Sequence, residues 1–267
     1  MIAGPCSHIM RIRSGLMVTG AKTIDKALSI FKYALNAQRP MAVAEIAIES
    51  GLPVATVYRH VAAFERAGLV RRDEGGRLSA GVELLRALDP ARFRKLFAEL
   101  ARPMLIVLSR RLDATAHLGV LEQDMVTYLV KAEAEGEKVF TIESQQLEAY
   151  CSGVGKVLLA NLCRKDLDKY LSGGPFPALT EHTITDPGKL RRELSGVRRR
   201  GYAIDRAEIE HGLYCVAAPV LNREGEAIGA VSASARNGAL IGSRRKKVLA
   251  SLFEAAEGLA EAISRGW

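Results

Sequence analysis

The sequence predicts an α+β protein with an N-terminal winged helix-turn-helix, a linker helix and a C-terminal domain built on an antiparallel sheet. Over residues 20–88, short amphipathic helices are separated by a tight glycine turn and followed by a glycine-rich hairpin. Over residues 89–113, apolar side chains recur with the spacing of a helix. Over residues 114–267, short alternating strands are interleaved with helices, which is typical of an α+β domain.

Helices are expected in the first domain at residues 23–38, 43–49 and 53 to about 67. Pro40 ends the first helix, because proline has no backbone N–H to donate. Gly51 ends the second helix, since glycine adopts the left-handed cap at the lowest cost. Pro53 falls in the first turn of the third helix, where a missing N–H does no harm. This spacing gives the last two helices helix-turn-helix geometry.

A hairpin is expected directly after the third helix, because the glycines of residues 73–76 (DEGG) supply the positive φ of a tight turn. A hairpin in this position is the wing of a DNA-binding module. Arg59 and Thr56 lie at the exposed start of the third helix, where an arginine would read guanine edges. The other predicted DNA contacts are Tyr58, Arg66, Arg71, Arg72 and Arg77. The alternative is a small helical domain with a solvated basic face.

The distribution of charge favours a nucleic-acid partner for the first domain. The chain has 38 basic and 30 acidic side chains, a net charge of +8. The first 88 residues hold 12 basic and 7 acidic groups, so +5 of the excess lies in a third of the chain. Such asymmetry indicates an anionic partner for the more basic part.

The rest of the chain is predicted to begin with a helix from residue 90 to about 113, which we interpret as a linker and dimerisation element. The alternative is a helix that packs on one of the two domains. Strands are expected at residues 116–121, 125–131, 138–142, 202–205, 213–221 and 227–234. Helices are expected at residues 155–162, 186–201 and 243–264.

Several small polar groups are predicted to converge in the second domain. Gly153 and Val154 precede a helix, so their backbone N–H groups would attract an anion. Ser232 and Ser234 alternate along one strand and therefore point to the same face. The other candidates are Asp205 and Cys215 at strand ends and an apolar wall of Val139, Leu147 and Leu213. Together these groups would suit a small carboxylate, and the alternative is that each is structural.

The motifs of both domains resemble those of IclR-type transcriptional regulators. In the first domain they are AEIA at 44–47, GLP at 51–53, TVYR at 56–59 and GLVRRDEGG at 68–76. In the second domain they are HLGV at 117–120, YCSGVGKVLLA at 150–160, RGYAID at 200–205, CVAAPV at 215–220 and SAS at 232–234. The chain departs from the family pattern at Val54 and Ala55, where family members often carry a basic or hydroxyl residue.

The resemblance implies a ligand-responsive transcription factor rather than an enzyme. Its expected partners are a double-stranded DNA operator and a small organic-acid effector, drawn from keto, sugar or aromatic acids. The second domain would be an effector-binding domain similar to GAF and PAS sensor domains, with the polar candidates above in its pocket. The family also implies homodimers that assemble into tetramers. Because one winged helix buries little DNA surface, we also expect two copies to bind a pseudo-palindromic site.

Enzyme-like patterns in the chain are incomplete. GVGK at 153–156 lacks the first glycine and the magnesium-binding hydroxyl of a phosphate loop. Asp205, His211 and Cys215 have the residue types of a thiol triad, but nothing in the sequence fixes their geometry. We therefore expect no catalytic residues, no metal and no cofactor. The remaining alternatives are a constitutive DNA-binding protein without an effector, and a small-molecule enzyme with an accessory DNA-binding domain.

The chain is predicted to be a cytoplasmic protein without a membrane partner. Its 4 cysteines are irregularly spaced, which does not indicate a disulfide framework. No apolar run approaches the roughly 20 residues that span a bilayer. Residues 1–19 lack the apolar region of a signal peptide and are expected to be a disordered arm, a tag-like extension or the product of an early start codon.

Overall fold

The computed structural model describes residues 22–35, 40–134, 138–236 and 238–264. The chain divides into two compact units, Met1–Ala80 and Gly81–Trp267, each with its own hydrophobic core. The arm expected at residues 1–19 lies outside the described residues. Within those ranges, no helix combines the length and the apolar character needed to cross a membrane.

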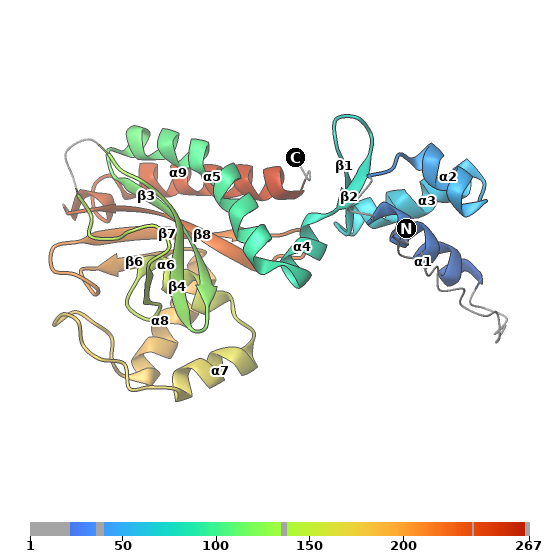
Figure 1. The fold of residues 1–267 in the computed structure, drawn as a ribbon. Helices are drawn as coiled ribbons and strands as arrows, with labels where there is room; N and C mark the ends of the chain where they lie inside the picture. Colours follow the sequence, from blue (N-terminus) through green and yellow to red (C-terminus); the bar gives the residue numbers. More distant parts are fainter. Residues whose placement is uncertain (1–21, 36–39, 135–137, 237, 265–267) are drawn as a thin grey trace, which may run out of the picture. The chain divides into compact units, whose positions relative to one another are not determined.

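The first unit begins with the helices α1 (Lys22–Ala34), α2 (Val43–Ser50) and α3 (Val54–Arg66) (Figure 1). Its core consists of apolar side chains that are almost completely buried, among them Ile30, Ile46, Val57, Val61 and Leu78. Gly51 ends α2 with a φ of +65°, the left-handed conformation expected of it. Pro53 caps α3 from just outside the helix instead of standing in its first turn. The predicted helix-turn-helix is therefore confirmed.

The hairpin after the third helix consists of β1 (Val70–Arg72) and β2 (Leu78–Ala80), which pair antiparallel. Its turn depends on Gly76, whose φ of +73° is in the left-handed region that favours glycine. A single bridge between Ala42 and Arg77 joins the hairpin to the residue before α2. The first unit is thus a winged helix-turn-helix.

The second unit is built on a six-stranded antiparallel sheet with the order β5-β4-β3-β8-β7-β6. Its strands are β3 (Thr115–Glu122), β4 (Met125–Ala132), β5 (Gln146–Glu148), β6 (Ala203–Arg206), β7 (Tyr214–Leu221) and β8 (Ala227–Ala235). The central pair, β3 and β8, comes from opposite ends of the domain sequence. The sheet therefore forms only when the whole domain is present.

Helices cover both faces of this sheet (Figure 1). They are α4 (Val82–Leu88), α5 (Pro90–Leu112), α6 (Gly153–Asn161), α7 (Arg164–Ser172), α8 (Pro187–Arg200) and α9 (Arg245–Ser264), with a 3-10 turn at Gly238–Leu240. α5 and α9 lie side by side on one face, where Phe97, Leu105 and Leu252 are buried. α6 lies on the other face and α8 packs against α6. α5, the helix predicted to be a linker, thus packs within the core of the second unit.

The strand predicted at residues 138–142 is wrong. Residues 138–142 are irregular, and the edge strand that pairs with β4 is β5. The alternating pattern of residues 138–142 reflects the burial of Val139 and Thr141 by neighbouring side chains rather than pairing with a strand. The Lys131 ammonium donates to the Val139 carbonyl at 2.8 Å, and Nε2 of His117 lies 2.8 Å from the Thr141 hydroxyl.

Two short helices, α4 and α7, have no counterpart among the sequence-based expectations. They contain 7 and 9 residues. Isolated helices shorter than about 12 residues are marginal in water, so packing must hold them. Leu85 of α4 and Tyr170 and Leu171 of α7 are the buried anchors that provide it.

Close packing at Gly155 makes the position of α6 sensitive to a single methyl group. A Cβ at Gly155 would lie 2.1 Å from the Ala149 carbonyl oxygen. We expect Gly155→Ala to lower the free energy of unfolding by about 3 kcal/mol or more in urea denaturation. Gly238→Ala is the control, because a Cβ there meets nothing within 4 Å. Equal losses in the two variants would contradict the packing described.

Candidate functional site

The face of α3 that was predicted to contact DNA points to solvent in the first unit. Arg59 and Arg66 are exposed, and Tyr58 is 56% exposed. Thr56 is half-buried at the start of the helix, and Arg71 is half-buried on β1. The opposite stripe of α3 lies in the core. A helix presented in this way can place its first two turns in a major groove.

Two arginines that were predicted to contact phosphates have partners inside the unit. Nε of Arg72 donates to Glu65 Oε1 at 2.7 Å, and its guanidinium lies 5.3 Å from the centre of the Tyr58 ring. Nη1 of Arg77 donates to the Pro40 carbonyl at 2.8 Å. These contacts tie the hairpin to the helices and fix the direction in which it projects.

The second candidate site is a cavity between the sheet and the start of α6. The register of the strands places Asp205 opposite Cys215, and Cys215 opposite Ser234. Because alternate residues of a strand share a face, Ser232 points to the same side as Ser234. α6 approaches this face so closely that a Cβ at Gly153 would lie 2.7 Å from the Cys215 sulfur.

Most of the predicted effector contacts line this cavity: Val139, Leu147, Gly153, Asp205, Leu213, Cys215 and Ser234. Ser232 lies beside it, with its hydroxyl 3.5 Å from Nδ1 of His117. Val154 is buried in the core between α6 and the sheet instead. The space between the lining atoms, counted with its opening to solvent, is about 280 Å³, and the part that the centre of a water molecule can reach is only about 10 Å³. A ligand of several heavy atoms can enter only if lining side chains move.

Six further residues of the described chain line the cavity and were not predicted as effector contacts from the sequence: His117, Tyr128, Phe140, Thr141, Ser152 and Ile209. The rings of His117 and Tyr128 lie 5.0 Å apart and project from β3 and β4. The sequence contained no signal for His117, because its position opposite Ser232 follows only from the pairing of β3 with β8. Phe140 and Thr141 belong to the segment that was predicted to be a strand, so their approach to the cavity was hidden.

Burial changes the protonation of three side chains in the cavity. Burial, together with the Lys131 charge, lowers the pKa of His117 to about 3, so its ring is neutral. Burial raises the pKa of Cys215 to about 12, which keeps the thiol protonated. Burial also raises the pKa of Asp205 to about 7, against the opposing effect of Lys156. The cavity thus presents neutral polar groups and one carboxyl that titrates near neutral pH.

A buried ion pair lies behind the cavity. Lys156 of α6 is completely buried, and its ammonium donates to the Ile204 carbonyl at 2.6 Å and to the Glu208 carboxylate. The Glu208 backbone N–H donates to Asp205 Oδ1 at 2.7 Å. Glu208 compensates the charge of Lys156, so the ammonium can be buried. Because Lys156 is on α6 and Glu208 follows β6, the pair links this helix to the end of the strand.

Both units match one family of known proteins. Residues 94–264 match the C-terminal domain of the bacterial transcriptional regulator IclR, and residues 23–74 match the IclR helix-turn-helix domain. The chain belongs to the IclR family. Membership identifies it as a transcriptional regulator with a DNA-binding helix-turn-helix, as the sequence predicted. The α+β fold class is also that of solved IclR structures.

Individual relatives extend over most of the chain. BhcR of Paracoccus denitrificans is 30% identical and covers 90% of this chain and 86% of its own. KdgR of Escherichia coli is 28% identical over 79% of this chain and 82% of its own. Thermotoga maritima IclR superposes with a TM-score of 0.61 at 27% identity, covering 91% and 98% of the two chains. An IclR homolog from Microbacterium hydrocarbonoxydans, complexed with 4-hydroxybenzoate, has a TM-score of 0.58 at 25% identity, covering 90% and 98%.

The cavity of this IclR-family chain lacks the geometry of a thiol triad. His211 does not line it, and its Nδ1 lies 3.3 Å from Oε2 of Glu181 on the surface. The Cys215 thiol is held in its protonated form by burial. Within the described part of the chain, no three His, Cys, Asp or Glu side chains gather closely enough to hold a metal ion.

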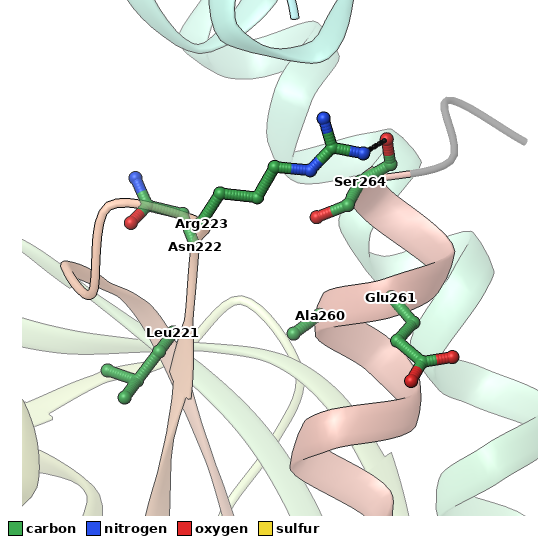
Figure 2. Close-up of a pocket in the computed structure, with 6 residues that line it drawn as sticks. All are labelled: Leu221, Asn222, Arg223, Ala260, Glu261 and Ser264. Atoms are coloured by element: carbon green, nitrogen blue, oxygen red, sulfur yellow. Dashed lines mark hydrogen bonds between the residues drawn. The ribbon is translucent and has the colours of Figure 1, made fainter. Parts of the chain in front are cut away.

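A second hollow lies where the turn between β7 and β8 meets the end of α9 (Figure 2). Its lining residues are Leu221, Asn222, Arg223, Ala260, Glu261 and Ser264. Arg223 crosses the hollow and donates to the Ser264 carbonyl at 2.9 Å. The hollow contains none of the predicted effector contacts, so the cavity at α6 is the candidate site of this unit.

The raised pKa of Asp205 makes a prediction about stability. In the unfolded chain this carboxyl ionises near its ordinary pKa of 3.8, whereas the folded protein holds the proton up to about 7. The contribution of Asp205 to stability is therefore highest in acid and falls as pH rises from about 4 to 7. The stability of Asp205→Asn relative to the parent protein should rise across this window by about 1.4 kcal/mol per pH unit.

The measurement is urea denaturation of both proteins at pH 4 to 8. Asp124→Asn makes the same substitution at an exposed turn of the same unit and serves as the control. A stability difference for Asp205→Asn that stays constant with pH would contradict the shifted pKa.

Proposed function

We propose that this IclR-family protein binds its operator as an oligomer and that a small organic acid in the α6 cavity sets its affinity for DNA. The observation that carries the effector is the convergence of Asp205, Cys215 and Ser234 on one cavity beside the helix start at Gly153. Hydroxyls, a helix N-terminus and apolar walls together suit a carboxylate that carries a small apolar body. The 4-hydroxybenzoate complex of the Microbacterium hydrocarbonoxydans homolog supports this ligand class.

DNA recognition is proposed to centre on α3. Thr56, Tyr58 and Arg59 would enter the major groove, while Arg66 and the hairpin arginines would contact or steer toward phosphates. One winged helix offers few reading side chains, so two copies on a pseudo-palindromic site are required for specific affinity. We propose homodimers, which pair further into a dimer of dimers.

The effector is proposed to act by shifting a conformational equilibrium. The cavity is nearly closed in the described conformation, so a ligand must favour a state in which the lining side chains have moved. A state that binds the acid more tightly is populated at the expense of the others, and its DNA affinity becomes the observed one. Coupling requires that the two states differ in their affinity for the acid and also in their affinity for DNA.

Two other functions make different predictions. An enzyme with an accessory DNA-binding domain would turn over the acid that it binds. The protonated Cys215 thiol and the absence of His211 from the described residues that line the cavity argue against nucleophilic chemistry at this site. A constitutive DNA-binding protein would show no change in DNA affinity with any acid. Ligand turnover and ligand-dependent DNA binding therefore separate the three possibilities.

The prediction for DNA binding concerns Arg59. We expect Arg59→Ala to weaken binding to an operator selected in vitro by about 1–3 kcal/mol and to relax preference at one base position. Fluorescence anisotropy with the selected duplex and single-base variants measures both effects. Arg164→Ala, at a side chain 95% exposed in the second unit, is the control. Unchanged affinity and preference would remove Arg59 from the reading surface.

The prediction for the effector concerns Ser234. Acids from the keto, sugar and aromatic classes are screened by thermal shift, where a ligand at 100 times its Kd adds about 2.7 kcal/mol to stability. We expect Ser234→Ala to weaken the response to an acid hit at least about tenfold, consistent with the loss of a hydrogen bond to a charged group, while DNA affinity stays unchanged. Ser251→Ala replaces another buried serine of the same unit, outside the cavity, and is the control. Equal dose–response curves for the two variants would place the effector elsewhere.

A further inference from the structure

The cavity contains a negative charge where an anion is proposed to bind. Of the described residues that line it, Asp205 is the one carboxyl, and none is a lysine or an arginine. Asp205 is 1% exposed. His117 cannot supply a compensating positive charge, because its ring is neutral in this environment. An ionised Asp205 would therefore repel an organic acid anion inside a buried site.

The groups around Asp205 do not relieve this conflict. The titratable groups that face it from neighbouring elements are Lys156 on α6, Glu208 just after β6, Cys215 on β7, Cys151 before α6 and Tyr128 on β4. Lys156 is the cation among them, and its charge is already compensated by the Glu208 carboxylate. Burial keeps the two thiols and the phenol protonated. With Asp205 ionised, this buried cluster has a net charge of −1, and a bound carboxylate would make it −2.

We propose that Asp205 takes up one proton from solvent when an organic acid anion enters the cavity, and that its neutral carboxyl then donates a hydrogen bond to the carboxylate of the ligand. This inference rests on the effector site proposed above. The ligand enters as the anion, water or buffer supplies the proton, and two carboxyl groups then share one negative charge. Paired carboxyl groups in a buried site behave in this way because both cannot ionise at close range.

The geometry of Asp205 fits a proton donor to the cavity. Its Oδ1 accepts the Glu208 N–H at 2.7 Å, which holds the carboxyl in one orientation. The structure gives this side chain no second hydrogen bond within the described residues, so Oδ2 remains to carry the proton. The start of α6 at Gly153 supplies backbone N–H groups on the same cavity. The cavity therefore offers a carboxylate both a carboxyl donor and backbone N–H donors without a cationic side chain.

The proton must be available near neutral pH for this device to work. Burial raises the pKa of Asp205 to about 7, so the free protein is partly protonated under ordinary conditions. Binding of an acid that is ionised throughout should then weaken about tenfold per pH unit above this value. Below it, affinity should change little with pH. Regulation by the acid would consequently respond to intracellular pH as well as to its concentration.

The test is isothermal titration calorimetry on the full-length protein with pyruvate, gluconate, benzoate and 4-hydroxybenzoate as probes. Each is titrated at pH 6 and pH 8 in two buffers of different ionisation enthalpy, which counts the protons taken up. We expect uptake close to one proton at pH 8 and clearly less at pH 6. Asp205→Asn keeps an acceptor for Glu208 and a donor for the ligand, so it should bind without proton uptake and with equal affinity at both pH values. Asp124→Asn should behave like the parent protein.

The outcomes separate this inference from the effector proposal on which it rests. An acid that binds with no proton uptake at pH 8 overturns the role of Asp205 and leaves the effector site standing. Uptake that persists in Asp205→Asn also overturns it, because another group then carries the proton. If no probe binds to the parent protein or to Asp205→Asn at either pH, the proposal of an organic-acid effector is wrong, and so is this inference. If the variant does not fold, the wild-type protein still tests the inference, because an acid that binds at pH 8 without proton uptake overturns it.

Discussion

The close approach of α6 to the sheet is the constraint on which the second unit depends. A nine-residue helix is buried between the strands and α8 along nearly its whole length. It fits because Gly153 and Gly155 carry no Cβ where the Cys215 sulfur and the Ala149 backbone already lie. Lys156 then fixes the helix to the end of β6 through a buried ion pair. The cavity is the space left beside the first turn of this helix, so its shape is set by the same contacts.

The polar groups in that cavity lower the stability of the fold, and their presence there indicates a functional site. A neutral histidine, a buried thiol and a carboxyl whose ionisation is opposed by burial would all be replaced by apolar groups in a core selected only for packing. Asp205 on β6 stands opposite Cys215 on β7, which pairs with Ser234. His117 on β3 stands opposite Ser232, two residues before Ser234 on β8. Local rules for a stable sheet face are broken at this one place, as they are at functional sites. The core on the opposite face, under α5 and α9, is a large cluster of buried apolar side chains.

In the first unit, two of the arginines on the hairpin make contacts within the protein. Basic side chains on a wing are expected to meet phosphates, yet Arg72 and Arg77 are engaged with Glu65, Tyr58 and the Pro40 carbonyl. Surface ion pairs of this kind contribute little free energy, about 0–1 kcal/mol each. Their effect is geometric, because they hold a hairpin of two three-residue strands against the helices.

The sequence by itself determined the two-part architecture, the winged helix-turn-helix and the family, because periodicity, helix caps and turn glycines are local signals. It also identified most residues that line the cavity, since the spacing of Ser232 and Ser234 alone shows that they share a face. It failed for residues 138–142, where burial by side chains imitates a strand pattern, and for the short helices α4 and α7, which depend on packing. Only the tertiary structure brought His117 and Tyr128 to the cavity and removed Val154 from it. The protonation of Asp205 was also decided there, since burial and the Lys156–Glu208 pair come from segments that meet only in the folded sheet.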